Sequence, residues 1–119
     1  MTPTAELRTR LRKLLDEVIP TGGTESDTRF MDADLDELLT EARNVFGATS
    51  AGWTMKAGMI ARELGNLQSH SVGQEQYVIV NLQTAQRTAL EMADRYDAMA
   101  RASGGSGSLV VSVERPEVV

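Results

Sequence analysis

The segment VIVNLQTAQRTALEMADRYDAM, residues 78–99, decides the fold. Its apolar residues alternate spacings of four and three, which is typical of a packed α-helix: Val78, Leu82, Ala85, Ala89, Met92, Tyr96 and Met99. We expect a helix over residues 74–102, about 43 Å long. We interpret this heptad seam as the central spine of a small four-helix bundle-like domain. The pattern leaves open that the seam contacts another subunit instead.

Two helices are expected in the first part of the chain. The first covers residues 3–18, with Thr2 as its N-cap, and it cannot continue through Pro20. The second starts at Asp32, which resembles an N-cap, and Gly47 breaks or bends it. Both segments carry apolar residues at helical spacing, so the predicted fold class is all-α.

A third helix is expected over residues 49–68, followed by a loop at residues 69–73. Its apolar residues lie on one side: Trp53, Ala57, Ile60, Ala61, Leu64 and Leu67. Glycines interrupt this helix at Gly52, Gly58 and Gly65. They either permit a close approach of another helix or are tolerated defects, and the sequence leaves both readings open.

The composition is that of one modest globular domain. The chain has 119 residues, of which 41% are apolar and 24% are charged. We expect a single helical domain over residues 1–102. The absence of cysteine excludes disulfides, thiol chemistry and Cys-ligated metals. No apolar run approaches the roughly 20 residues of a membrane span, and the first residues lack a signal-peptide pattern, so we expect no membrane association.

Charge is unevenly distributed along the chain. Residues 1–13 carry a net charge of +3, whereas residues 24–41 carry −6. Such segments are either two solvated faces or opposite poles that steer one subunit onto the next. Under the second reading, the candidate subunit-interface residues are Arg8, Arg12, Asp34 and Glu37.

The end of the chain changes character after the last helical segment. Residues 103–108 are Ser and Gly only, which predicts a flexible tether. Residues 109–119 follow as a β-prone arm, and Pro116 limits its ladder. A lone strand needs a partner outside its own chain, so we expect a docking arm. Its candidate partner-binding residues are Leu109, Val110, Val111 and Val113.

No residue pattern indicates chemistry. The only histidine, His70, has no second metal ligand and no nucleophile beside it in the sequence. The run from Asp32 to Asp36 resembles the start of an EF-hand loop, but Glu37 replaces the required Gly and Arg43 replaces the final Glu. We therefore expect no enzyme activity, no metal and no cofactor.

Three segments resemble head-to-tail adaptor (connector) proteins of long-tailed bacteriophages. They are LLDEVIPTGGTESDTRF at residues 14–30, DADLDELLTEA at residues 32–42 and AGWTMKA at residues 51–57. The resemblance covers about residues 7–64 by motif and residues 75–102 by helical character only. It implies a small helical subunit of a homo-oligomeric ring, typically of about twelve copies, below the portal of the filled head.

The resemblance also implies partners and a location. The ring would extend the channel for double-stranded DNA, bind the portal protein and receive the next neck or tail connector, with the arm at residues 109–119 gripping the portal or an adjacent ring. The protein would reside in the neck of the virion, and in the host cytoplasm during assembly.

Two other classes share the size of the chain. A secreted helical-hairpin protein with a Trp-x-Gly turn is disfavoured, because Met55 stands where that glycine is needed and more than two helices are expected. A small intracellular helical regulator, such as an antitoxin or an anti-sigma subunit, would also be acidic with a tail. This regulator is the alternative function that the sequence leaves open.

Overall fold

The structure is a computed structural model that describes residues 1–70 and 76–104. This part of the chain is all-α: one 3-10 turn, η1 (Glu25–Asp27), accompanies four helices, α1 (Ala5–Leu14), α2 (Asp32–Glu41), α3 (Val45–His70) and α4 (Gln76–Gly104). The predicted fold class and the four helices are therefore confirmed. The arm at residues 109–119, and all of the tether beyond Gly104, lie outside the described residues.

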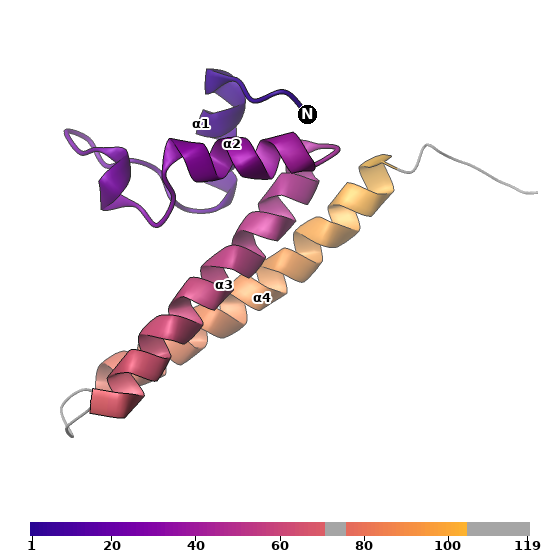
Figure 1. The fold of residues 1–119 in the computed structure, drawn as a ribbon. Helices are drawn as coiled ribbons and strands as arrows, with labels where there is room; N and C mark the ends of the chain where they lie inside the picture. The colour runs from indigo at the N-terminus through magenta and orange to yellow at the C-terminus, as the bar shows by residue number, and fades with distance from the viewer. Residues whose placement is uncertain (71–75, 105–119) are drawn as a thin grey trace, which may run out of the picture.

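Helices α3 and α4 form a long antiparallel hairpin, and α1 and α2 pack against one end of it (Figure 1). This end contains the start of α3 and the end of α4. The opposite end of the hairpin extends beyond α1 and α2, so the four helices do not form one bundle of equal length. The architecture is a helical hairpin that carries a two-helix head at its base.

Helix α1 is shorter than predicted at both ends. Its N-cap is Thr4 and not Thr2, because the Leu7 N–H donates to Thr4 Oγ1 at 3.1 Å. The helix ends at Leu14, and Asp16 then adopts a left-handed backbone with φ of 58°. This turn redirects the chain before Pro20, which the sequence prediction had taken as the helix stop.

The junction of α2 and α3 lies earlier than the predicted break at Gly47. Helix α2 ends at Glu41, and Asn44 caps the next helix by accepting a hydrogen bond from the Gly47 N–H at 2.9 Å. Gly47 is therefore inside α3. Asp32 is the first residue of α2 and not its cap, since the capping contact comes from the Asp34 carboxylate, which accepts from the Met31 N–H at 2.9 Å.

Two predicted loops are partly helical. Helix α3 extends beyond both ends of the expected 49–68 range and includes Ser69 and His70. Helix α4 includes Ser103 and Gly104, which had been assigned to the tether. Propensity alone shortens such helices, because it does not count the packing of one long helix against the other.

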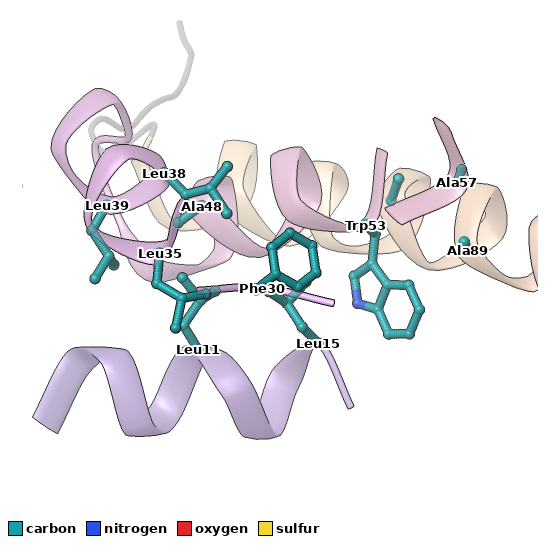
Figure 2. Close-up of a cluster of buried hydrophobic side chains, with 11 residues drawn as sticks. Leu11, Leu15, Phe30, Leu35, Leu38, Leu39, Ala48, Trp53, Ala57 and Ala89 are labelled. Carbon is teal, nitrogen blue, oxygen red and sulfur yellow. The ribbon is translucent and has the colours of Figure 1, made fainter. Parts of the chain in front are cut away.

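The buried apolar side chains fall into two groups. The larger group, here the head cluster, joins α1, α2 and the base of the hairpin: Leu11, Leu15, Phe30, Leu35, Leu38, Leu39, Ala48, Trp53, Ala57, Ala89 and Ala93 (Figure 2). The smaller group, here the tip cluster, lies between α3 and α4 only and consists of Ile60, Leu64 and Ile79, with Leu67 and Leu82 packed against them. The two clusters share no residue. The far end of the hairpin is therefore held only by side-chain contacts between α3 and α4.

The predicted seam of α4 has the correct helical spacing, but the buried side of the helix is rotated relative to it. Its members Ala89 and Tyr96 pack in the head cluster and Leu82 packs in the tip cluster, but Val78 and Met99 are 44% and 40% exposed. Of the positions one residue further along, Ile79 and Ala93 are buried. The contact with α3 is therefore rotated toward the small residues of α4.

Candidate functional site

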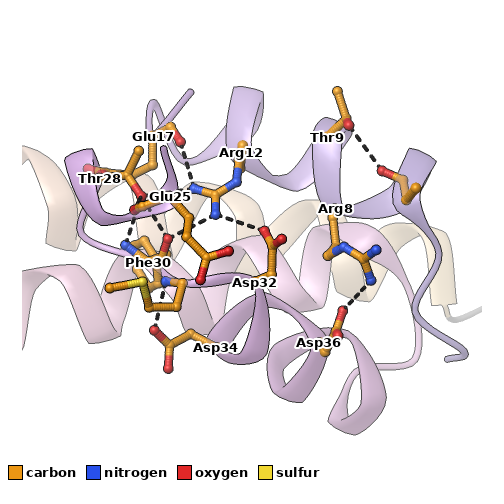
Figure 3. A network of polar contacts seen from close by, with 12 residues as sticks. Arg8, Thr9, Arg12, Glu17, Glu25, Thr28, Phe30, Asp32, Asp34 and Asp36 are labelled. Carbon is orange, nitrogen blue, oxygen red and sulfur yellow. Dashed lines mark hydrogen bonds and ion pairs between the residues drawn. The ribbon is translucent and has the colours of Figure 1, made fainter. Parts of the chain in front are cut away.

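The most organised polar site surrounds Arg12, whose side chain lies in the interior of the head (Figure 3). One guanidinium nitrogen, Nη1, donates to the Glu17 carbonyl oxygen at 3.1 Å and to Thr28 Oγ1 at 2.9 Å. The other, Nη2, donates to the Phe30 carbonyl oxygen at 2.9 Å and to Asp32 Oδ1 at 3.0 Å. This one side chain therefore fastens the connector between α1 and α2 to both helices.

Helix α3 fastens the same connector from the other side. Lys56 Nζ donates to the Leu15 carbonyl oxygen at 3.0 Å, and it lies 2.6 Å from Glu17 Oε2 and 4.6 Å from the centre of the Trp53 ring. The Trp53 indole N–H donates to the Leu14 carbonyl oxygen at 3.1 Å. These contacts give the polar atoms beyond the end of α1 a partner, as buried polar groups require.

The backbone of α3 at Gly52 also lies close to Leu15, directly after the end of α1. A Cβ built on Gly52 would lie 2.7 Å from a methyl carbon of Leu15, so α3 meets the end of α1 where only glycine fits. The reading of this glycine as a point of close approach is confirmed. Gly58 differs, because its Cβ would meet only Arg62 Nη1, at 3.9 Å.

Two of the four proposed interface residues are engaged inside the subunit. Arg12 is only 5% exposed and pairs with Asp32, while Arg8 pairs with Asp36 at 2.9 Å. Two ion pairs thus join the basic segment to the acidic segment across the contact of α1 with α2. Four of the five N–H donors of Arg12 are therefore engaged inside the subunit.

The other two interface candidates lie on α2. Asp34 completes the cap of its own helix, and Glu37 is exposed. The four arm candidates, Leu109, Val110, Val111 and Val113, lie outside the described residues, so the docking arm stays a prediction.

These ion pairs shift the pKa of their members in the expected directions. The hydrogen bond from Arg12 lowers the pKa of the Asp32 carboxyl below its ordinary value of 3.8, against a smaller opposing effect of desolvation. Hydrogen bonds from the guanidinium groups to Asp36 and Glu63 raise the pKa of Arg8 and of Arg29, respectively. These shifts favour the charged forms of Asp32, Arg8 and Arg29, so their ion pairs act as electrostatic fastenings.

A second feature is a set of exposed apolar side chains on α4, of which the predicted seam included only Val78 and Met99. Five large apolar side chains of this helix are exposed, at fractions between 40% and 76%: Tyr77, Val78, Val80, Leu90 and Met99. A long helix ordinarily presents polar residues to solvent. The five side chains project from more than one side of α4, because successive residues of a helix lie about 100° apart. Aromatic residues and Met are enriched at protein–protein interfaces.

The described residues show no cluster of three or more His, Asp and Glu side chains that could hold a metal ion. His70 is the last residue of α3. None of the helices in residues 1–70 and 76–104 combines the length and the apolar character needed to cross a bilayer. The expected absence of enzyme activity and cofactors stays a prediction.

The comparisons with known proteins add no assignment. No protein-family model, no curated protein and no solved structure matches this chain. The function must therefore be argued from the surfaces described above.

Proposed function

We propose that this chain is a structural assembly subunit, a head-to-tail adaptor of a long-tailed bacteriophage. Copies of the chain form a ring below the portal, extend the DNA channel and join the filled head to further neck or tail proteins. The ring resides in the virion neck, and the arm at residues 109–119 grips the portal or an adjacent ring by strand addition.

The observation that carries this proposal is the exposed apolar surface of α4 on an otherwise firmly fastened subunit. Tyr77 is 76% exposed and Val80 is 52% exposed, and the apolar surface of both would gain free energy by burial. A partner protein is the simplest means of burial. The resemblance of residues 14–57 to adaptor proteins, and the all-α fold of the described residues, support the choice of partner.

The test uses the purified full chain and the portal protein encoded in the same genome. We expect native mass spectrometry to show a portal complex carrying a ring of adaptor copies. Deletion of the gene should yield DNA-filled heads without tails. A chain that binds no portal, with normal particle yield from the deletion strain, would overturn the proposal.

The same experiment addresses the regulatory alternative. An antitoxin or an anti-sigma subunit would form a complex of small fixed stoichiometry with its target and would leave the portal free. Portal binding in the absence of any such complex would exclude that class.

A further inference from the structure

Helix α4 carries an open apolar row that runs most of its length. Its members recur every seven residues, at Val78, Ala85, Met92 and Met99, and we name them the outer α4 row. Val78, Ala85 and Met99 are exposed, and Met92 is half-buried against the head cluster. A seven-residue period is the spacing at which one helix packs along another, so a row with this period fits a helix that the subunit itself does not supply.

A complementary surface exists on α3 of the same chain. Small residues at alternate spacings of three and four form the small α3 row: Ala51, Thr54, Gly58, Ala61 and Gly65. All are exposed except Gly58, which is half-buried. Small residues let a second helix approach closely, and the missing side chain of Gly58 has no use inside the subunit because a Cβ fits there.

The two rows match in register. Ser50 Oγ donates to the Ala93 carbonyl oxygen at 2.7 Å and so aligns the antiparallel helices. Counting outward from this bond sets Ala51 level with Met92, Gly58 level with Ala85 and Gly65 level with Val78. Each larger residue of one row therefore faces a small residue of the other if a neighbouring hairpin lies alongside.

The base of the small α3 row also offers a recess and a charge. A cavity of about 230 Å³ is lined by Leu38, Glu41, Ala42, Gly47 and Ala51, at the level of Met92 on α4. Glu41 at this recess and Arg95 beside the outer α4 row are both exposed, and neither forms an ion pair within the described part of the chain. Arg95 of one copy would then approach Glu41 of the next.

The rows face opposite sides of the hairpin. Met92 of the outer α4 row packs against the head cluster, whereas on α3 the residues that contact the end of α1 and its connector are Gly52 and Lys56, away from the small α3 row. A surface and its complement on opposite sides give a head-to-tail contact, which closes into a ring when the rotation allows. Neither row contains an acidic residue, so copies with a net charge of −5 can meet there.

We infer that the outer α4 row of one copy docks on the small α3 row of the next copy. The matched positions run from Ala51 and Met92 at one end to Gly65 and Val78 at the other, about 20 Å along the helices. The inference rests on the proposed ring for the number of copies, and the contact itself is tested without phage particles.

Cysteine pairing tests the contact, because the chain has no cysteine of its own. The double variant Gly58→Cys/Ala85→Cys places one thiol on each row, and oxidation should give a ladder of covalent multimers on a non-reducing gel. The matched control Gly58→Cys/Arg87→Cys moves the second thiol to the other side of α4 and should give no ladder. Oxidation is carried out on the concentrated free protein and on the portal-bound protein.

A charge exchange provides a second readout. Glu41→Arg and Arg95→Glu should each weaken self-association about two- to five-fold in sedimentation, and the double variant should restore it. The contact would be overturned if the Gly58/Ala85 pair and the control Gly58/Arg87 pair gave equal ladders. It would also be overturned if the Gly58/Ala85 pair gave no ladder in either the free or the portal-bound protein. A ladder from a protein that binds no portal would leave the contact standing and overturn only the neck function.

Discussion

Arg12 was predicted to lie at a subunit interface, but its side chain stabilises the fold of its own subunit. Its guanidinium bonds two backbone carbonyl oxygens, one hydroxyl and one carboxylate, and these acceptors come from the connector and the start of α2. If the guanidinium were removed, those acceptor oxygens would lose their hydrogen-bond donor inside the head. The resulting loss of stability is far larger than that from breaking a surface ion pair.

The first prediction compares Arg12 with its neighbour on α1. Arg12→Met should lower the free energy of unfolding by about 2–4 kcal/mol, since it strands buried acceptors. Arg8→Met removes a half-exposed pair with Asp36 and should cost much less, because water screens such a pair. Urea unfolding followed by circular dichroism measures both, and equal losses would show that the Arg12 site is not a fastening.

The second prediction concerns pH. Because the pKa of Asp32 in the folded protein lies below its ordinary value of 3.8, its ion pair stabilises fully above that value. The stabilisation is lost as the pH falls through the folded pKa. Asp32→Asn should therefore be slightly less stable than the parent chain at pH 7 and equally stable near pH 2, in urea titrations at both values. A difference that persists at the acidic pH would exclude the carboxylate as its source.

At the scale of the elements, the two clusters differ in how thoroughly they bury their side chains. Leu39 of the head cluster is fully buried, whereas Leu82 is half-buried beside the tip cluster. Only α3 and α4 cover the tip, while four elements cover the head.

The third prediction follows from this difference. Leu39→Ala should cost about 2–5 kcal/mol and Leu82→Ala about 1–2 kcal/mol, because the latter leaves a smaller cavity beside solvent. Native-state hydrogen exchange should also show the tip half of α3 opening before its base half. Faster exchange at the base than at the tip would contradict the division into two clusters.

The number of helices and the all-α class were predictable from the sequence. The buried side of α4 was not, because its predicted seam and its observed contact with α3 share several residues. In α4 the residues Leu82, Ala89 and Tyr96 belong both to the predicted seam and to the observed contact. Periodicity does not decide which flank faces α3. The structure selects the flank with Ala93, because small side chains let α3 approach, and Met99 is left exposed while Met92 packs against the head cluster.

The candidate site was less predictable than the helices. Local charge patterns identified the basic and the acidic segment, but their mutual pairing depends on the contact of α1 with α2, which no local signal reports. A useful signal was present at Gly52 and Gly58, whose different roles emerge only when each is placed against its neighbours.

At the scale of the whole molecule, the head domain and the arm should act separately. Residues 109–119 follow a Ser/Gly segment, so their deletion should change the melting temperature of the domain by less than about 2 °C. The same deletion should weaken portal or ring attachment and leave filled heads without tails. Val111→Pro should mimic it by removing a backbone donor. Normal joining of heads to tails by the truncated protein would show that the arm is passive.

The separation of the head cluster from the tip cluster also affects how the sequence can vary. Substitutions in clusters that share no side chain add independently in free energy, whereas neighbours within one cluster compensate each other. Residues of the tip can therefore change together to suit a different partner while the head keeps its stability. In a lineage of such chains, drift would accumulate at Ile60, Leu64 and Ile79 as a covarying set, without a matching change around Phe30.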